Sequence, residues 1–74
     1  MDIRTMDDDM ARIYLKSNGI VGAFKWDDRP EGWVVYLGTP DDSCGFRETV
    51  CSSRKKATRL VEEYQARIDA LLSI

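Results

Sequence analysis

The stretch that decides the fold is residues 20–37, IVGAFKWDDRPEGWVVYL. The larger apolar side chains recur at every second residue over 20–26 and again over 33–37, and a period of two is typical of β-strands. The residues between them, Asp27 to Gly32, are acids, an arginine, a proline and a glycine, which favour a turn. This stretch therefore predicts a β-hairpin.

Outward from the hairpin, the flanking sequence predicts one more strand and two helices. A second turn-forming loop, Gly38 to Gly45, precedes a short strand over residues 46–51. Before the hairpin, residues 6–17 carry apolar side chains at steps of three and four, which predicts an amphipathic helix. The stripe comprises Met6, Met10, Ile13 and Tyr14, with Ala11 and Leu15 beside it, and Asn18-Gly19 ends the helix.

The last part of the chain predicts a longer helix, capped by Ser52 or Ser53. Its apolar seam comprises Ala57, Leu60, Val61, Tyr64, Ile68, Leu71 and Leu72, and the pairs Arg59–Glu63 and Glu63–Arg67 are expected on its outer surface. The chain is thus expected to be one α+β domain over residues 1–74, in α-β-β-β-α order. One face of its three-stranded antiparallel sheet would be covered by the two helices.

The alternation also assigns the two faces of the sheet. The larger apolar set is expected under the helices: Ile20, Phe24, Trp26, Trp33, Val35, Leu37, Phe46 and Val50. The other set would form the open face: Val21, Ala23, Lys25, Val34, Tyr36, Arg47, Thr49 and Cys51. On that face Lys25, Tyr36 and Arg47 are candidate contact residues, and an ordinary solvated face is the alternative.

Composition indicates a cytoplasmic protein that does not enter a membrane. The net charge is −2 and 43% of the residues are hydrophobic, but no apolar run approaches the ~20 residues that span a bilayer. The acidic N-terminus is unlike a signal peptide. Cys44 and Cys51 would lie about 23 Å apart in an extended strand, too far for a disulfide, so both are expected to be free thiols.

Residues that carry catalysis are scarce in this sequence. It has no histidine, and therefore lacks the commonest general base and metal ligand. Two cysteines alone do not complete a zinc site, and no phosphate-binding loop is present. The run Asp7-Asp8-Asp9 matches the dipole at a helix start, and its side chains diverge rather than converge on an ion. No enzyme, cofactor or metal is expected.

Four cations at the start of the last helix form the most prominent charged cluster: Arg54, Lys55, Lys56 and Arg59. Cations there oppose the helix dipole, and a local rule broken without compensation points toward function. The cluster is a candidate anion or nucleic-acid contact, with a solvated face as the alternative.

Two resemblances bear on this cluster and on the sheet. The α-β-β-β-α order and Ser53-Arg54-Lys55-Lys56-Ala57 resemble the double-stranded-RNA-binding fold, in which lysines at the last helix touch phosphates. The family's proline–histidine loop is replaced here by the acidic stretch from Asp27 to Gly32. Residues 20–74 also resemble the arm-binding modules of tyrosine integrases, which read DNA with a sheet face. That resemblance would use Lys25, Tyr36 and Arg47.

The leading hypothesis is a non-enzymatic binding or regulatory protein that contacts another macromolecule, with a protein as its partner. Its size and charge resemble those of phage or prophage accessory proteins that inhibit host complexes. Asp27, Asp28 and Glu31 are the candidate acidic contacts with a basic partner. A nucleic-acid-binding module is the alternative function, and a homodimer through the open face or the last helix is a further option.

Overall fold

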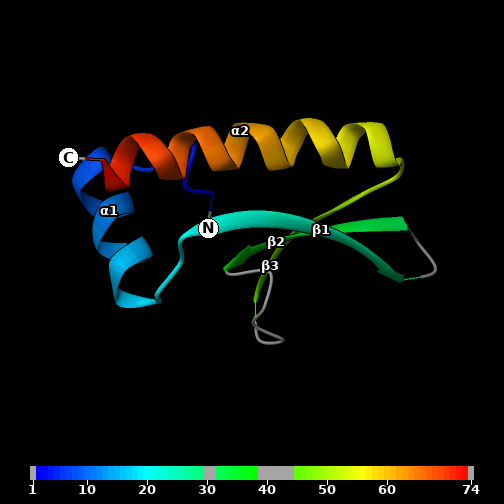
Figure 1. The fold of residues 1–74 in the computed structure, drawn as a ribbon, viewed down its shortest axis with the longest axis horizontal. Helices are drawn as coiled ribbons and strands as arrows, with labels where there is room; N and C mark the ends of the chain where they lie inside the picture. The colour runs from blue at the N-terminus through cyan, green and yellow to red at the C-terminus, as the bar shows by residue number, and fades with distance from the viewer. Residues whose placement is uncertain (1, 30–31, 39–44, 74) are drawn as a thin grey trace.

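The protein has two helices and a three-stranded antiparallel sheet in α-β-β-β-α order, so the predicted fold class is confirmed (Figure 1). The computed structural model describes residues 2–29, 32–38 and 45–73, without the side chains of residues 28 and 29. The elements are α1 (Asp8–Ser17), β1 (Gly22–Arg29), β2 (Gly32–Gly38), β3 (Phe46–Cys51) and α2 (Arg54–Leu72). The strand order across the sheet is β1-β2-β3, so β2 is central.

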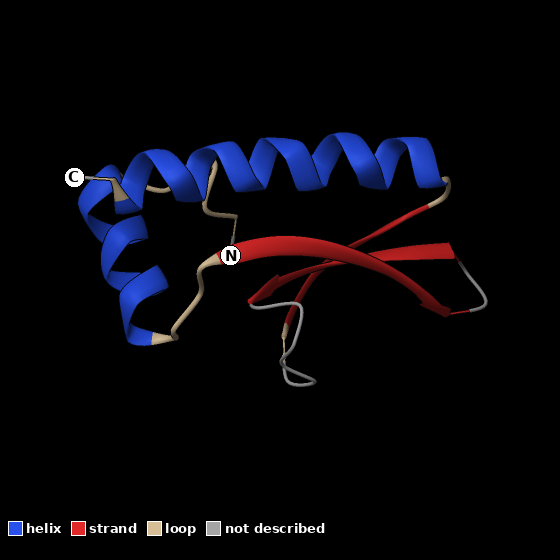
Figure 2. Cartoon of the chain, viewed as in Figure 1, coloured by secondary structure: helices blue, strands red, loops and turns tan. Residues whose placement is uncertain are grey.

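Helix α2 runs along one face of the sheet and packs mainly over β1 and β2 (Figure 2). Ser53 is its N-cap, and the serine hydroxyl accepts a hydrogen bond from the Lys56 N–H at 3.3 Å. The predicted seam is confirmed: it supplies the buried side chains of Ala57, Tyr64, Ile68 and Leu71, while Leu60, Val61 and Leu72 pack partly buried against the core. This helix therefore covers the sheet.

Helix α1 packs against α2 rather than against a strand (Figure 1). Asp7 caps it by accepting the Asp9 N–H, and Gly19, with a φ of 65°, ends it as predicted. The expected stripe is partly wrong. Ala11 and Leu15 are fully buried, whereas Met10 and Ile13 are 60% and 61% exposed. The small side chain of Ala11 lies in the same buried cluster as Ile68 and Leu71 of α2.

The hairpin forms, but its register differs from the predicted one in β1. Next to the turn, Arg29 pairs with Gly32. Continuing that pairing without interruption would set Trp26 opposite Val35, on the helix side of the sheet. An irregularity between Trp26 and Arg29 shifts the register by one residue, so Trp26 lies opposite Val34 instead. Because side chains alternate along a strand, one residue of shift moves the whole of β1 to the opposite face.

The faces expected for β1 are therefore exchanged. Phe24 and Trp26 lie on the open face, whereas Ala23 and Lys25 pair with Leu37 and Val35, which are both buried in the core. Strand β1 also extends to Arg29. Asp27 to Arg29 were expected in the turn and belong instead to the strand.

The close approach of α2 to β1 explains why small residues lie beneath the helix. The Ala23 N–H donates a hydrogen bond to Oε1 of Gln65 in α2 at 3.0 Å. A Cβ atom on Gly22 would lie only 2.8 Å from the same oxygen. An aromatic ring between β1 and α2 would force the helix away from the sheet.

Strand β3 carries a second irregularity, between its pairs with Val35 and Tyr36 of β2. Arg47 pairs with Tyr36, and Val50 pairs with Val34, so both lie on the open face. The expectation is confirmed for Arg47 and wrong for Val50. Thr49 and Cys51 pair with Val35 and Trp33 on the helix side, also against expectation, and Cys51 is a buried free thiol. Cys44 lies outside the described residues.

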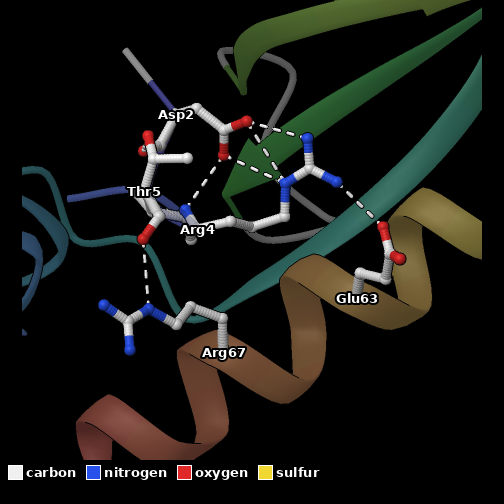
Figure 3. A network of polar contacts seen from close by, with 6 residues as sticks. Asp2, Arg4, Thr5, Glu63 and Arg67 are labelled. Carbon is white, nitrogen blue, oxygen red and sulfur yellow. Dashed lines mark hydrogen bonds and ion pairs between the residues drawn. The ribbon is translucent and has the colours of Figure 1, made fainter.

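The segment before α1 is fixed to the side of α2 by arginines (Figure 3). Arg67 donates to the carbonyl oxygens of Ile3 and Met6, at 3.1 and 2.9 Å, and Ile3 is fully buried. Arg4 pairs with Asp2 and with Glu63, each at 2.8 Å. The predicted helix pairs Arg59–Glu63 and Glu63–Arg67 are not formed. Glu63 forms its ion pair with Arg4 instead, and Arg67 forms its ion pair with Asp8.

Candidate functional site

The open sheet face is the first candidate surface, and we define it by Phe24, Trp26, Val34, Tyr36, Arg47 and Val50. Its largest side chain, Trp26, is 57% exposed. Val34, from the central strand, is fully buried but lies outside the core cluster beneath α2. Val34 is thus buried on the side of the sheet away from α2, which makes this face a second, smaller apolar layer.

Two aromatic rings on this face stack on one another. Phe24 and Tyr36 are directly opposite across β1 and β2, with ring centroids 5.3 Å apart and planes inclined by 16°. Cross-strand aromatic pairs stabilise a sheet. Because each ring uses one flat surface on the other, that surface is not open to a nucleic-acid base.

The three residues predicted for sheet-face contact do not all share a face. Tyr36 and Arg47 are cross-strand partners on the open face. Lys25 pairs with Val35 and so lies on the helix side, which corrects the prediction that grouped it with them. Among the described side chains assigned to the open face, Arg47 is the only charged residue.

The sequence missed Phe24 and Trp26 as surface residues, because uninterrupted alternation places them in the core. The stretch offers one signal of this: Ala23 and Gly22 are the smallest residues of β1, and small residues permit close helix packing. The exposed pair Met10 and Ile13 was also missed, since it falls in the same three-residue spacing as a buried stripe.

The second candidate surface is the basic start of α2, where all four predicted residues are exposed. They line two shallow hollows. One, of about 560 Å³, is lined by Arg54, Lys55, Thr58, Arg59 and Glu62. The other, of about 490 Å³, lies between β3 and α2 and is lined by Thr49, Val50, Cys51, Ser52, Lys56, Arg59 and Leu60.

Within the described part of the chain, none of these four cations pairs with an acid, whereas Arg4, Arg12 and Arg67 all form ion pairs. Arg54 lies over the Trp33 ring at 5.7 Å from its centroid, a cation–π contact. Their positive charge is thus directed to solvent.

Of the three acids predicted to contact a basic partner, only Asp27 is fully described, and its side chain is exposed. Asp28 is placed in β1 by its backbone, without a described side chain, and Glu31 lies outside the described residues. Their role stays a prediction.

Burial raises the pKa of two side chains, Tyr64 of α2 and Glu48 of β3. It raises the pKa of Tyr64 to about 12, and the nearby Glu48 carboxylate adds to this. It also raises the pKa of Glu48 itself, with the negative charge of Asp2 contributing. Conversely, the hydrogen bonds from Arg4 lower the pKa of Asp2. Arg4 holds the N-terminal segment against α2, through its ion pair with Glu63 and its position over the Tyr64 ring, so these groups have a structural position.

Residues 2–29, 32–38 and 45–73 include no group of three acids or cysteines placed to hold a metal ion. Within the same ranges, neither helix is long and apolar enough to cross a membrane. Comparison with protein families, with curated proteins and with solved structures finds no match for this chain.

Proposed function

We propose that the chain is a non-enzymatic binding protein that acts by covering a surface of another protein, and that the open sheet face is its contact surface. The observation that carries this proposal is an exposed tryptophan in an aromatic layer outside the core. Such a layer loses contact with water only when a partner covers it.

The composition of the open sheet face supports a protein as partner. The centres of protein interfaces are enriched in aromatic residues and arginine and depleted in lysine and acids. Trp26, Tyr36 and Arg47 belong to the three residue types that dominate binding energy at such interfaces. A nucleic-acid surface would require several cations around the rings, because phosphate neutralisation supplies most of the affinity.

The specific form of the proposal is an accessory inhibitor of a host protein complex, of the kind that phages and prophages encode. A 74-residue chain is large enough to cover one patch of a partner, about 800 Å² on each side of a standard interface. Blocking a surface needs no catalytic group.

The test is affinity capture by the tagged protein from a lysate of the cells that express it, with quantitative mass spectrometry. Trp26→Ala should lose the specific partner, whereas the matched control Met10→Ala, equally exposed on α1, should retain it. Retention of the same partner by both Trp26→Ala and Phe24→Ala would overturn the assignment of this surface.

A nucleic-acid-binding module is the second candidate function, favoured by Arg54, Lys55, Lys56 and Arg59, which pair with no acid among the residues that the structure describes. Its test is a fluorescence titration with duplex DNA and duplex RNA at two salt concentrations. Binding that weakens steeply with salt would favour it, and no binding at low salt would exclude it.

A further inference from the structure

We propose that the hollow between β3 and α2, hereafter the β3–α2 groove, binds an extended acidic peptide segment that pairs with β3 as a fourth strand. This inference goes beyond the proposed function, because the groove lies at the edge strand and against α2, and it shares only Val50 with the open sheet face. The occupant is a protein segment with carboxylates on alternate residues.

The first argument is the free edge of the sheet. Strand β3 is at the end of the strand order, and its ladder with β2 is its only backbone pairing within the described part of the chain. Every second residue of an edge strand directs its N–H and C=O outward. Pairing is regular over Thr49, Val50 and Cys51, and these are the β3 residues that line the groove.

The second argument is the shape of the site, since a helix forms its other wall. Lys56, Arg59 and Leu60 of α2 face the three strand residues across the groove. Peptides that add to a sheet edge gain affinity from backbone hydrogen bonds and specificity from the alternate side chains. The strand residues together with Ser52 span about 13 Å, which suits a segment of about four to six residues.

The third argument is charge. Lys56 and Arg59 are exposed in the wall of the groove and pair with no acid among the described residues, and Arg54 and Lys55 lie in the same helical turn. Leu60, Val50 and Cys51 supply the apolar part of the lining. A segment that alternates acids with β-branched residues would place its carboxylates on the helix side, near the cations, and its apolar side chains on the opposite side, near Val50.

The fourth argument comes from the chain itself. Positions 56, 60, 63 and 67 follow one another on one side of α2, because steps of three and four keep a helix face. At 63 and 67 this side already holds the N-terminal segment, through the Arg4–Glu63 ion pair (Figure 3) and through the hydrogen bonds from Arg67 to the carbonyls of Ile3 and Met6. The flank of α2 thus already binds the backbone of another chain segment through its side chains, and the groove continues this flank toward the start of the helix.

The experiment measures fluorescence anisotropy of the labelled, end-capped peptide Glu-Val-Glu-Val-Glu-Val with the full chain. We expect binding, and we expect Lys56→Glu combined with Arg59→Glu to weaken it about tenfold or more, because both attractions become repulsions. The matched control Lys16→Glu reverses an exposed cation on α1 and should change affinity less than about twofold. Circular dichroism verifies that each variant is folded.

A second peptide separates strand pairing from simple charge attraction. Methylation of alternate backbone nitrogens removes the N–H donors and keeps every carboxylate, so about tenfold weaker binding is expected. Equal affinity for both peptides would overturn the proposal, as would no binding at millimolar peptide. Tighter, steeply salt-dependent binding of duplex DNA or RNA that the peptide cannot displace would also overturn it.

This design tests the peptide site in the groove and the contact surface on the open sheet face independently. Trp26→Ala should leave peptide affinity unchanged, so loss of partner capture with retained peptide binding affects only the proposed function. Amide chemical shifts of Thr49 to Ser52 should move on addition of the peptide, while those of Phe24 and Trp26 stay in place. The opposite pattern of shifts would contradict the location of this site.

Discussion

The two faces of the sheet are made by the same three strands, yet they bury different kinds of residue. Beneath α2 lie small and aliphatic side chains such as Ala23, Val35 and Leu37, whereas the open sheet face carries Phe24 and Trp26. The difference shows that hydrophobicity alone does not decide burial. The gap between β1 and α2 is narrow. It therefore admits small residues such as Ala23 and excludes the rings of Phe24 and Trp26, although these rings are more hydrophobic than Ala23.

The largest effect is expected from breaking the covered face. Ile68→Ala removes a fully buried side chain from the cluster that joins α2 to the sheet. It should lower the free energy of unfolding by about 2–5 kcal/mol. Urea denaturation followed by tryptophan fluorescence measures this loss. Ile13→Ala, an exposed control on α1, should change stability by less than about 0.5 kcal/mol; comparable losses in both variants would contradict the packing described.

Alkaline pH should also weaken the covered face, through Tyr64. Its pKa is raised to about 12 in the folded protein from an ordinary value of 10.0, so as pH rises the unfolded chain loses the phenol proton first. The contribution of Tyr64 to the free energy of unfolding is therefore fully present below pH 10, and about 2–3 kcal/mol of it should be lost as the pH rises toward 12. Urea midpoints of the wild type and Tyr64→Phe check this, because the variant lacks that loss. Parallel pH profiles would show that Tyr64 is not the cause.

A smaller effect is expected on the open sheet face. Trp26→Ala should cost about 1 kcal/mol, less than Ile68→Ala, because Trp26 is more than half exposed and leaves solvent rather than a cavity. Acrylamide quenching sharpens the comparison of the two tryptophans. Trp26 alone, in Trp33→Phe, should be quenched more readily than Trp33 alone, in Trp26→Phe. Equal protection of both tryptophans from acrylamide would contradict the register shift and favour the uninterrupted hairpin pairing.

The smallest expected change is a gain in stability at the edge of the covered face. Burial raises the pKa of Glu48, so ionising this carboxylate opposes folding once the pH exceeds its ordinary value of 4.5. Glu48→Gln should therefore raise the urea midpoint slightly at neutral pH and leave it unchanged in acid, below about pH 4. A lower midpoint at neutral pH would indicate that the carboxylate is held by contacts that favour its charged form.

The elements and their order follow from the sequence, because periodicity and caps are local signals. The seam of α2 from Ala57 to Leu72 and the Ser53 cap were predictable from spacing alone. The face of β1 was not, since one irregular residue after Trp26 reverses a pattern that is otherwise unambiguous. For the same reason the candidate contact residues Tyr36 and Arg47 were placed correctly and Lys25 was not.

Other parts of the site depend on contacts between distant residues, and no short-range pattern reveals them. Ile3 is fully buried, and Arg67, far along the chain, donates a hydrogen bond to its carbonyl. The predicted cations at the start of α2 are exposed as expected, but their wall of the groove is completed by β3, which spacing within one helix cannot show.

The irregular pairing between Trp26 and Arg29 has a consequence for how this chain tolerates insertions and deletions. Most hairpin tips absorb a gained or lost residue with little effect on the strands that follow. Here, two residues of β1 oppose one of β2 between the pairs Trp26–Val34 and Arg29–Gly32. Loss of one of the two would make the ladder continuous and leave Trp26 opposite Val34, so Phe24 and Trp26 would stay on the open sheet face. A single-codon deletion at this tip would thus leave the residues beneath α2 unchanged.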